Sequence, residues 1–186
     1  MAFPTLRTER LTLREITQDD APALLDIHGD ADAMRWYGTD PLATLEQARQ
    51  MVEKFAGWRN LPAPGVRWGL ALHQDGPLIG SIGLFKWNRG WRCCTLGYEL
   101  ARGQQGQGLM SEALNAALAW GFEHMELNRI EAQVHPDNLA SLKLLERLDF
   151  KVEGRARQAG FWLGRYQDLI NLSLLREDSA LAAATA

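Results

Sequence analysis

The residues with the clearest chemical potential form a glycine- and glutamine-rich segment, Arg102-Gly-Gln-Gln-Gly-Gln-Gly108. A strand pattern precedes it and an amphipathic helix pattern follows at once. The first turn of a helix leaves main-chain N–H groups unpaired and carries partial positive charge. Glycine lets a bulky anion approach those groups closely. This order therefore predicts a pyrophosphate site, although the glycines taken alone are equally compatible with an ordinary turn.

The segment differs from two common nucleotide-binding turns. A P-loop requires Gly-x4-Gly-Lys-Ser/Thr, and no lysine lies here. A Rossmann turn requires a third glycine where this chain has Ser111. It also belongs near the first strand of a parallel sheet, whereas this turn follows strands that we expect to be antiparallel. Coenzyme A is the diphosphate ligand that remains.

Cysteine and histidine are not arranged for metal binding or nucleophilic attack. The two cysteines, Cys93 and Cys94, are adjacent, so a bridge between them would be strained. They begin their strand without a nearby histidine in the sequence, which argues against a cysteine nucleophile. The four histidines show no metal-ligand spacing. We therefore expect reduced thiols, a reducing compartment and no metal.

The elements that position the turn follow from hydrophobic periodicity. Apolar residues at intervals of three and four predict helices from near Thr17, Thr44, Leu109 and Leu139. The order of elements predicts an α/β (mixed α+β) sandwich with a seven-stranded, mostly antiparallel sheet and about four helices. Gln74–Pro77 is the turn of a predicted hairpin. The predicted strands are Leu11–Glu15, Val66–His73, Leu78–Trp87, Trp91–Ala101, Asn128–Val134, Phe150–Arg155 and Leu169–Leu175.

Length and composition fit one globular domain. The 186 residues are 46% hydrophobic and carry a net charge of −3, without a run of lysine or arginine. This argues against a nucleic-acid binder. No apolar stretch reaches the roughly 18 residues of a membrane span, and the start lacks the apolar core of a signal peptide. We expect a single domain over residues 1–178, a disordered tail over 179–186, a cytoplasmic location, and neither nucleic acid nor membrane as a partner.

Four segments, in this order along nearly the whole chain, carry a family resemblance. They are the opening strand Thr8–Arg14, the turn and helix Gln105–Leu114, the Asn-x-x-Ser helix with its following strand at Asn138–Phe150, and the closing segments around Tyr166–Asp168 and Leu174–Glu177. Gln105–Leu114 resembles the acetyl-CoA motif Gln/Arg-x-x-Gly-x-Gly/Ala. Together they resemble the GNAT superfamily of N-acetyltransferases, and more closely its RimJ/RimL branch.

The resemblance implies a GNAT-like fold and transfer of an acetyl group from acetyl-CoA, a co-substrate, to a primary amine. Main-chain N–H groups near Leu100 would polarise the thioester carbonyl. Asn138 would hydrogen-bond the pantetheine amides, cap its helix, or do both. The predicted cofactor-binding residues are Leu100, Ala101, Arg102, Gln104, Gln105, Gly106, Gln107, Gly108, Leu109, Met110 and Asn138.

Two residues are candidates for proton transfer. On the predicted strand, Glu99 shares a face with small residues, so we expect room beside its carboxylate. Similarity to the RimJ/RimL enzymes favours Glu99 as the base, acting directly or through a water, over a solvated glutamate on an exposed face. Ser141, in the first turn of its helix, is the candidate acid for the leaving thiolate; a serine that only starts the helix is the alternative.

Two positions depart from the family pattern. Gly103 stands where the acetyl-CoA motif opens with Gln or Arg, so either Gln104 or Arg102 substitutes for that residue or the position is unused. Asp149 stands where this branch usually has glycine, and we expect it in a turn with positive φ, which Asp tolerates better than most residues.

The sequence leaves the acceptor open. RimJ/RimL relatives imply a protein N-terminal α-amino group, as on ribosomal proteins, and other members imply a small-molecule amine or an amino acid. The first two helices and Trp36–Pro41 would shape the acceptor site. A non-catalytic acyl-CoA sensor is a further alternative, which the presence of both Glu99 and Ser141 disfavours. Related enzymes also imply a homodimer.

Overall fold

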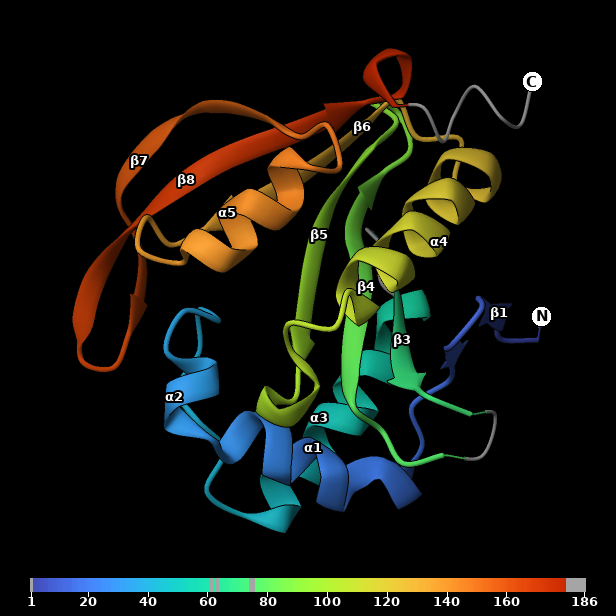
Figure 1. Ribbon diagram of the computed structural model, residues 1–186, viewed down its shortest axis with the longest axis vertical. Helices are drawn as coiled ribbons and strands as arrows, with labels where there is room; N and C mark the ends of the chain where they lie inside the picture. Colours follow the sequence, from blue (N-terminus) through green and yellow to red (C-terminus); the bar gives the residue numbers. More distant parts are fainter. Residues whose placement is uncertain (1, 61, 63, 74–75, 180–186) are drawn as a thin grey trace.

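The computed structural model describes residues 2–60, 62, 64–73 and 76–179. Its centre is an eight-stranded sheet in the order β1-β2-β3-β4-β5-β6-β8-β7 (Figure 1). All neighbouring strands are antiparallel except β5 and β6. The strands are β1 (Leu6–Arg7), β2 (Thr12–Arg14), β3 (Val66–Ala71), β4 (Gly80–Asn88), β5 (Cys93–Leu100), β6 (Arg129–Val134), β7 (Lys151–Trp162) and β8 (Arg165–Leu175).

The predicted fold class is confirmed, but the sheet has eight strands rather than seven. The additional strand, β1, has only two residues, which is too short to show alternation. The described residues also form five α-helices rather than four, because the four-residue α2 was not predicted. The helices are α1 (Ala21–Gly29), α2 (Ala31–Met34), α3 (Leu45–Gly57), α4 (Leu109–His124) and α5 (Leu139–Glu146).

Helices cover both faces of the sheet. On one face, α4 and α5 bury residues such as Leu114, Leu118 and Leu145 in the main core. On the other face, α1 and α3 bury a second cluster that includes Leu24 and Val52. The helix predicted from near Thr44 begins with a capping box, in which the Thr44 hydroxyl accepts from Gln47 N (3.2 Å) and the Gln47 side chain accepts from Thr44 N (3.1 Å). The sheet therefore separates two layers of helices.

The hairpin of β7 and β8 is longer than predicted. We expected strands only at Phe150–Arg155 and Leu169–Leu175, but both continue to the turn at Leu163–Gly164. Most of β7 is exposed on both faces, so its sequence carries no hydrophobic alternation. The hairpin packs against the segment after α2, because Trp162 Nε1 donates to Arg35 O (3.0 Å).

Two sequence predictions include residues that the structure does not describe. Positions 74 and 75 of the predicted turn Gln74–Pro77 lie outside them, as do residues 180–186 of the predicted tail. Ser179, placed at the start of that tail, is buried instead and its N–H donates to Arg176 O (3.3 Å). No helix in the described ranges is long and apolar enough to cross a membrane.

Candidate active site

The glycine-rich turn has the backbone shape that its sequence predicts. A short 3-10 turn, Arg102–Gln104, follows β5, and α4 begins at Leu109. Gly106 and Gly108 have φ angles of +76° and +77°, and Gly108 is the N-cap of the 16-residue α4. A Cβ added at Gly106 would meet nothing within 4 Å. The first turn of α4 therefore presents its free N–H groups beside open space, which fits a diphosphate.

Side chains of the turn are largely occupied in shaping it. Gln105 Nε2 donates to Leu100 O (3.0 Å) and Gln107 Nε2 donates to Gly103 O (3.3 Å). Arg10 Nη1 donates to Gln107 O (2.9 Å) and Arg10 Nε contacts Glu112 Oε2 (2.7 Å), so the N-terminal segment braces the turn. Any anion contact from this turn is then mainly a main-chain contact.

The flanking residues predicted to bind the cofactor divide into three groups. Leu109 and Met110 are 2% and 7% exposed and pack in the main core, so only their main chains can reach a ligand. Arg102 is exposed and pairs with Asp32 of α2 (3.2 Å). Ala101 and Gln104 are half-buried at the end of β5 and in the 3-10 turn.

β5 and β6 diverge beside this turn. Their pairing covers only Cys93–Thr95 with Arg129–Glu131, after which the strands separate (Figure 1). Ala101 N donates to Ile79 O (2.8 Å) on the β4 side. Because N–H groups alternate in direction along a strand, Leu100 N–H points toward β6, as does its carbonyl, which accepts from Gln105. Leu100 thus offers a main-chain donor at the edge of the gap.

Ser141 lies across this gap from β5. Asn138 caps α5, since its Oδ1 accepts from Ser141 N (3.2 Å), which bears out the capping role. The Ser141 hydroxyl lies 2.5 Å from the hydroxyl of Tyr98. Tyr98 was not predicted as a site residue, and its alternation with the core residues Leu96 and Leu100 gave no sign of a polar partner.

Glu99 lies on the opposite face of β5, in a filled polar network. Its carboxylate accepts from Arg67 Nη2, from the Ser81 hydroxyl and from His28 Nε2 (3.2 Å). We expected open space beside small residues, and that expectation is wrong. The space beside the small residues on this face is filled. A Cβ at Gly83 would lie 3.1 Å from both Arg67 Nη1 and the Trp58 ring, and a Cβ at Gly97 would lie 3.1 Å from the Phe85 ring and 3.9 Å from Arg67 Nη1.

This network fixes the charge of Glu99. Burial alone would raise the pKa of Glu99, but the positive charge of Arg67, with hydrogen bonds from His28 and Ser81, lowers it to about 2. Burial likewise lowers the pKa of Arg67, and the Glu99 carboxylate more than reverses that effect. Both groups are therefore ionised at every physiological pH.

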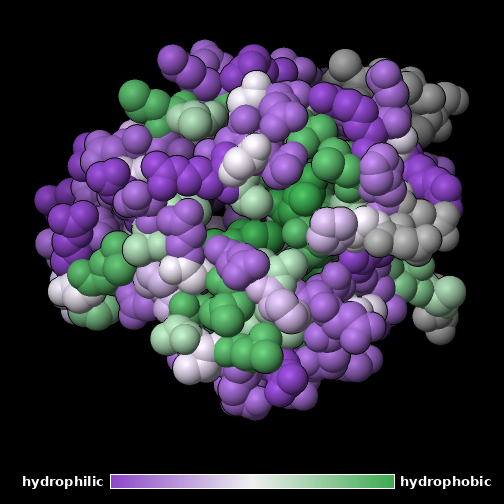
Figure 2. Space-filling view, turned by 60° about the horizontal axis from the view of Figure 1, so that its bottom comes forward, coloured by the Kyte–Doolittle hydropathy of each residue, from purple (hydrophilic) through white to green (hydrophobic). Residues whose placement is uncertain are grey.

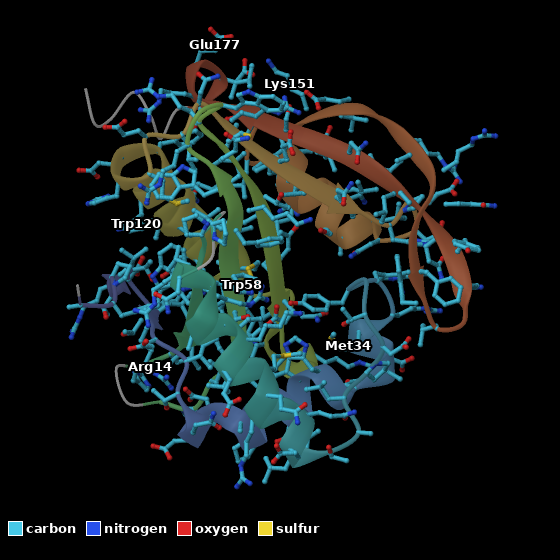
Figure 3. All side chains as sticks on the ribbon, turned by 180° about the vertical axis from the view of Figure 1, so that it is seen from behind. Arg14, Met34, Trp58, Trp120, Lys151 and Glu177 are labelled. Carbon is cyan, nitrogen blue, oxygen red and sulfur yellow. The ribbon has the colours of Figure 1, made fainter. Side chains whose placement is uncertain are left out.

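Aromatic rings and the segment after α2 enclose Arg67. Its Cζ lies 4.6 Å from the ring centre of Phe55 and 5.8 Å from that of Trp58, which projects over the central strands in Figure 3. Arg67 Nη2 also donates to the Tyr37 hydroxyl (2.6 Å). An arginine between Val66 and Trp68 in an otherwise apolar strand was the available sequence signal for this partner.

A second aromatic cluster joins three segments near the end of β6. His135 stacks on Trp36 with centroids 4.2 Å apart, and its Nε2 lies 3.1 Å from Gln167 Oε1 of β8. The Trp162 ring lies at a steep angle to the same imidazole, with ring centroids 6.1 Å apart. Trp36 belongs to Trp36–Pro41, which we expected to shape the acceptor site. In a view toward the lower end of Figure 1, hydrophobic residues gather in a hollowed region framed by hydrophilic ones (Figure 2).

Comparison with known proteins decides the family. The Acetyltransferase (GNAT) domain matches residues 10–151, which is well over half of the chain. The chain belongs to the GNAT acetyltransferase family. As a GNAT N-acetyltransferase, it uses acetyl-CoA. The φ of +65° at Asp149 also agrees with the prediction of a turn with positive φ at the position where the RimJ/RimL branch has glycine.

Relatives cover nearly the whole of this GNAT enzyme. It is 34% identical over 174 residues to an uncharacterized N-acetyltransferase, YoaA, of Bacillus subtilis, covering 94% of this chain and 98% of that one. It is 34% identical over 185 residues to the ribosomal protein uS5-alanine N-acetyltransferase of Escherichia coli, covering 93% and 91%. The fold matches a Vibrio cholerae spermidine N-acetyltransferase solved with CoA and spermine, with a TM-score of 0.78 at 24% identity over 91% and 97% of the chains.

Proposed function

We propose that this GNAT enzyme transfers the acetyl group by direct attack of a primary amine in a ternary complex. The observation that carries the proposal is the placement of the two candidate groups on opposite faces of β5. Glu99 contacts His28 of α1, whereas Tyr98 and Ser141 lie on the face of α4 and α5. Acceptor and cofactor would thus enter from different sides and meet in the gap between β5 and β6.

The main chain holds the cofactor in this proposal. N–H groups of residues 105–110 bind the diphosphate, and Asn138 contacts pantetheine while it caps α5. Acetyl-CoA supplies an acetyl group activated as a thioester. Leu100 N–H donates to the carbonyl oxygen as negative charge develops on it. The gap beside β5, the positive φ angles and the open space at Gly106 support this placement.

Glu99 serves the acceptor side. As the amine attacks, its nitrogen becomes positive and acidic, and a fixed carboxylate nearby favours that change. Its pKa of about 2 makes it a weak base, so we propose that it receives the proton only as the C–N bond forms, directly or through a water. Ser141 donates to the sulfur as the thiolate departs.

We propose a protein N-terminal α-amino group as the acceptor. The relative that supports this acts on ribosomal protein uS5, and its similarity covers nearly the whole chain. The spermidine N-acetyltransferase of similar fold favours a small polyamine as the second candidate. We also propose a single domain over residues 1–178 and a homodimer.

An acceptor screen tests the proposed function. Purified enzyme is incubated with acetyl-CoA and either N-terminal peptides, including an alanine-initiated ribosomal sequence, or polyamines and amino acids, and CoA release is followed. Faster release with peptides than with any small amine is the expected result. Faster release with polyamines would select the second candidate, and cofactor binding without turnover on any amine would indicate a sensor.

A further inference from the structure

The hydroxyl pair formed by Tyr98 and Ser141 is a polar contact between β5 and α5 beside the gap. Tyr98 lies three positions beyond Thr95, the last β5 residue paired with β6, and Ser141 lies in the first turn of α5. Their oxygens are 2.5 Å apart. The predicted acid is therefore not an isolated serine but one half of a short hydrogen-bonded pair.

The direction of this hydrogen bond decides whether Ser141 can donate its hydroxyl hydrogen to the sulfur of the cofactor. A hydroxyl has one hydrogen to donate and two lone pairs to accept with. If Ser141 donates to Tyr98, its only hydrogen is used and none remains for the sulfur. If Tyr98 donates, Ser141 accepts with one lone pair and keeps its own hydrogen for a third atom.

The environment of Tyr98 suits it as the donor. Burial raises the pKa of Tyr98 to about 12, against a smaller lowering by Ser141, so the phenol keeps its proton at every working pH. Its ring packs against the core on the face of α4 and α5, which holds the hydroxyl in place. A phenol is also a stronger hydrogen-bond donor than an aliphatic hydroxyl, since it is the more acidic of the two.

We propose that Tyr98 is a positioning residue that donates to Ser141 Oγ and thereby aims the Ser141 hydroxyl hydrogen at the departing thiolate. This rests on the proposed function. As the C–N bond forms, the C–S bond breaks with its electron pair on sulfur. The Ser141 hydroxyl stabilises that charge by donating a hydrogen bond to sulfur, while Tyr98 donates to Ser141 Oγ. Sulfur finally takes a proton from solvent, which balances the proton that the amine releases to Glu99.

Two measurements test the proposal on Tyr98→Phe, Ser141→Ala and the double variant. The first is steady-state kinetics with the best amine from the screen. The second needs no acceptor: it is the pKa of the CoA thiol in the binary complex, followed by the ultraviolet absorbance of the thiolate. Tyr166→Phe is the matched control, because it removes the hydroxyl of an exposed tyrosine on the hairpin.

A hydrogen bond to a charged group sets the expected size at about tenfold or more. Tyr98→Phe should lower kcat about tenfold with KM for acetyl-CoA within about twofold, and should lower the thiolate fraction of bound CoA by a similar factor. Ser141→Ala should do the same, the double variant should be no worse than Ser141→Ala, and Tyr166→Phe should match wild type.

The possible outcomes distinguish failure of the proposed role of Tyr98 from failure of the proposed transferase function. A wild-type kcat and bound-thiol pKa in Tyr98→Phe would overturn the inference and leave the transferase proposal intact, as would an effect confined to KM. Additive losses in the double variant would also overturn it. If no amine is acetylated but the thiolate is stabilised in wild type and not in Tyr98→Phe, the pair acts as inferred and the proposed function fails.

Discussion

At the scale of single residues, the charge of Glu99 is set by its ionic and hydrogen-bonding partners rather than by exposure to solvent. Alternation along β5 placed it correctly on the face opposite Tyr98. The network of Arg67, Ser81 and His28 could not be predicted from the sequence, since Arg67 lies 32 positions from Glu99 along the chain. The structure thus replaces a free carboxylate with one that a buried polar network keeps ionised in the resting enzyme.

Replacing Glu99 tests its part in the chemistry. Glu99→Gln should lower turnover at least about tenfold, the usual scale of a general base, while acetyl-CoA still binds in a calorimetric titration. The change also leaves buried Arg67 unpaired, which costs about 3–5 kcal/mol, so the melting temperature should fall.

Ser81→Ala is the control for that substitution. It removes the hydrogen bond from Ser81 to the same carboxylate and the one that Ser81 Oγ accepts from Arg67 Nε (2.7 Å), but it keeps the charge of Glu99. It should therefore cost about 2 kcal/mol of stability, less than the loss of the ion pair. Wild-type turnover in folded Glu99→Gln would remove Glu99 from the mechanism without touching the family assignment.

The low pKa of Glu99 makes a prediction about pH. Because its folded pKa of about 2 lies below the ordinary 4.5, its carboxylate is present above both values and is lost only as pH falls toward 2. The acid limb of kcat/KM should therefore follow the pKa of the acceptor amine. Profiles with two acceptors of different amine pKa should shift by that difference, and an identical limb near pH 6–7 for both would assign it to an enzyme group instead.

At the scale of elements, the glycine-rich turn was read well from sequence because its signal is local. Strand, glycines and helix follow one another within a few residues, and helix N-terminal chemistry depends on little else. The long hairpin was missed because β7 is exposed on both faces and bends at two register shifts. Contacts between distant elements, such as Tyr98 with Ser141, likewise have no local signature.

The backbone of the turn can be tested at Gly108. Gly108→Ala forces a Cβ into the left-handed region, which costs about 1–2 kcal/mol, and places it at the start of α4. The Kd for acetyl-CoA should rise at least about tenfold. Gly164→Ala carries the same backbone strain, at φ +70° on the hairpin, and should leave that Kd unchanged. Equal effects of the two variants would show that strain, not position, is responsible.

The hairpin should matter for the acceptor and not for the cofactor. Trp162→Phe removes the donor to Arg35 O, a loss of about 1 kcal/mol that loosens the segment after α2. KM for the amine should rise several-fold while KM for acetyl-CoA stays constant. Trp91→Phe, at a tryptophan 80% exposed, is the control. A rise in KM for acetyl-CoA would place the hairpin on the cofactor side.

At the scale of the whole molecule, the acceptor side, with Glu99, and the cofactor side, with Ser141, lie on opposite faces of one sheet. The two sides meet where β5 and β6 separate. The parallel step between these strands is the only one among the described strands, and the gap opens directly after it. Catalysis as proposed requires this gap to be the cofactor channel, with the diphosphate bound by main-chain N–H groups of residues 105–110.

Titration calorimetry that compares acetyl-CoA with S-acetylpantetheine, which lacks the diphosphate and the adenosine 3′-phosphate attached to it, tests that placement most directly. Two hydrogen bonds to charged phosphate oxygens predict binding at least about a hundredfold tighter for acetyl-CoA. Equal affinities, or no heat with acetyl-CoA, would contradict the account.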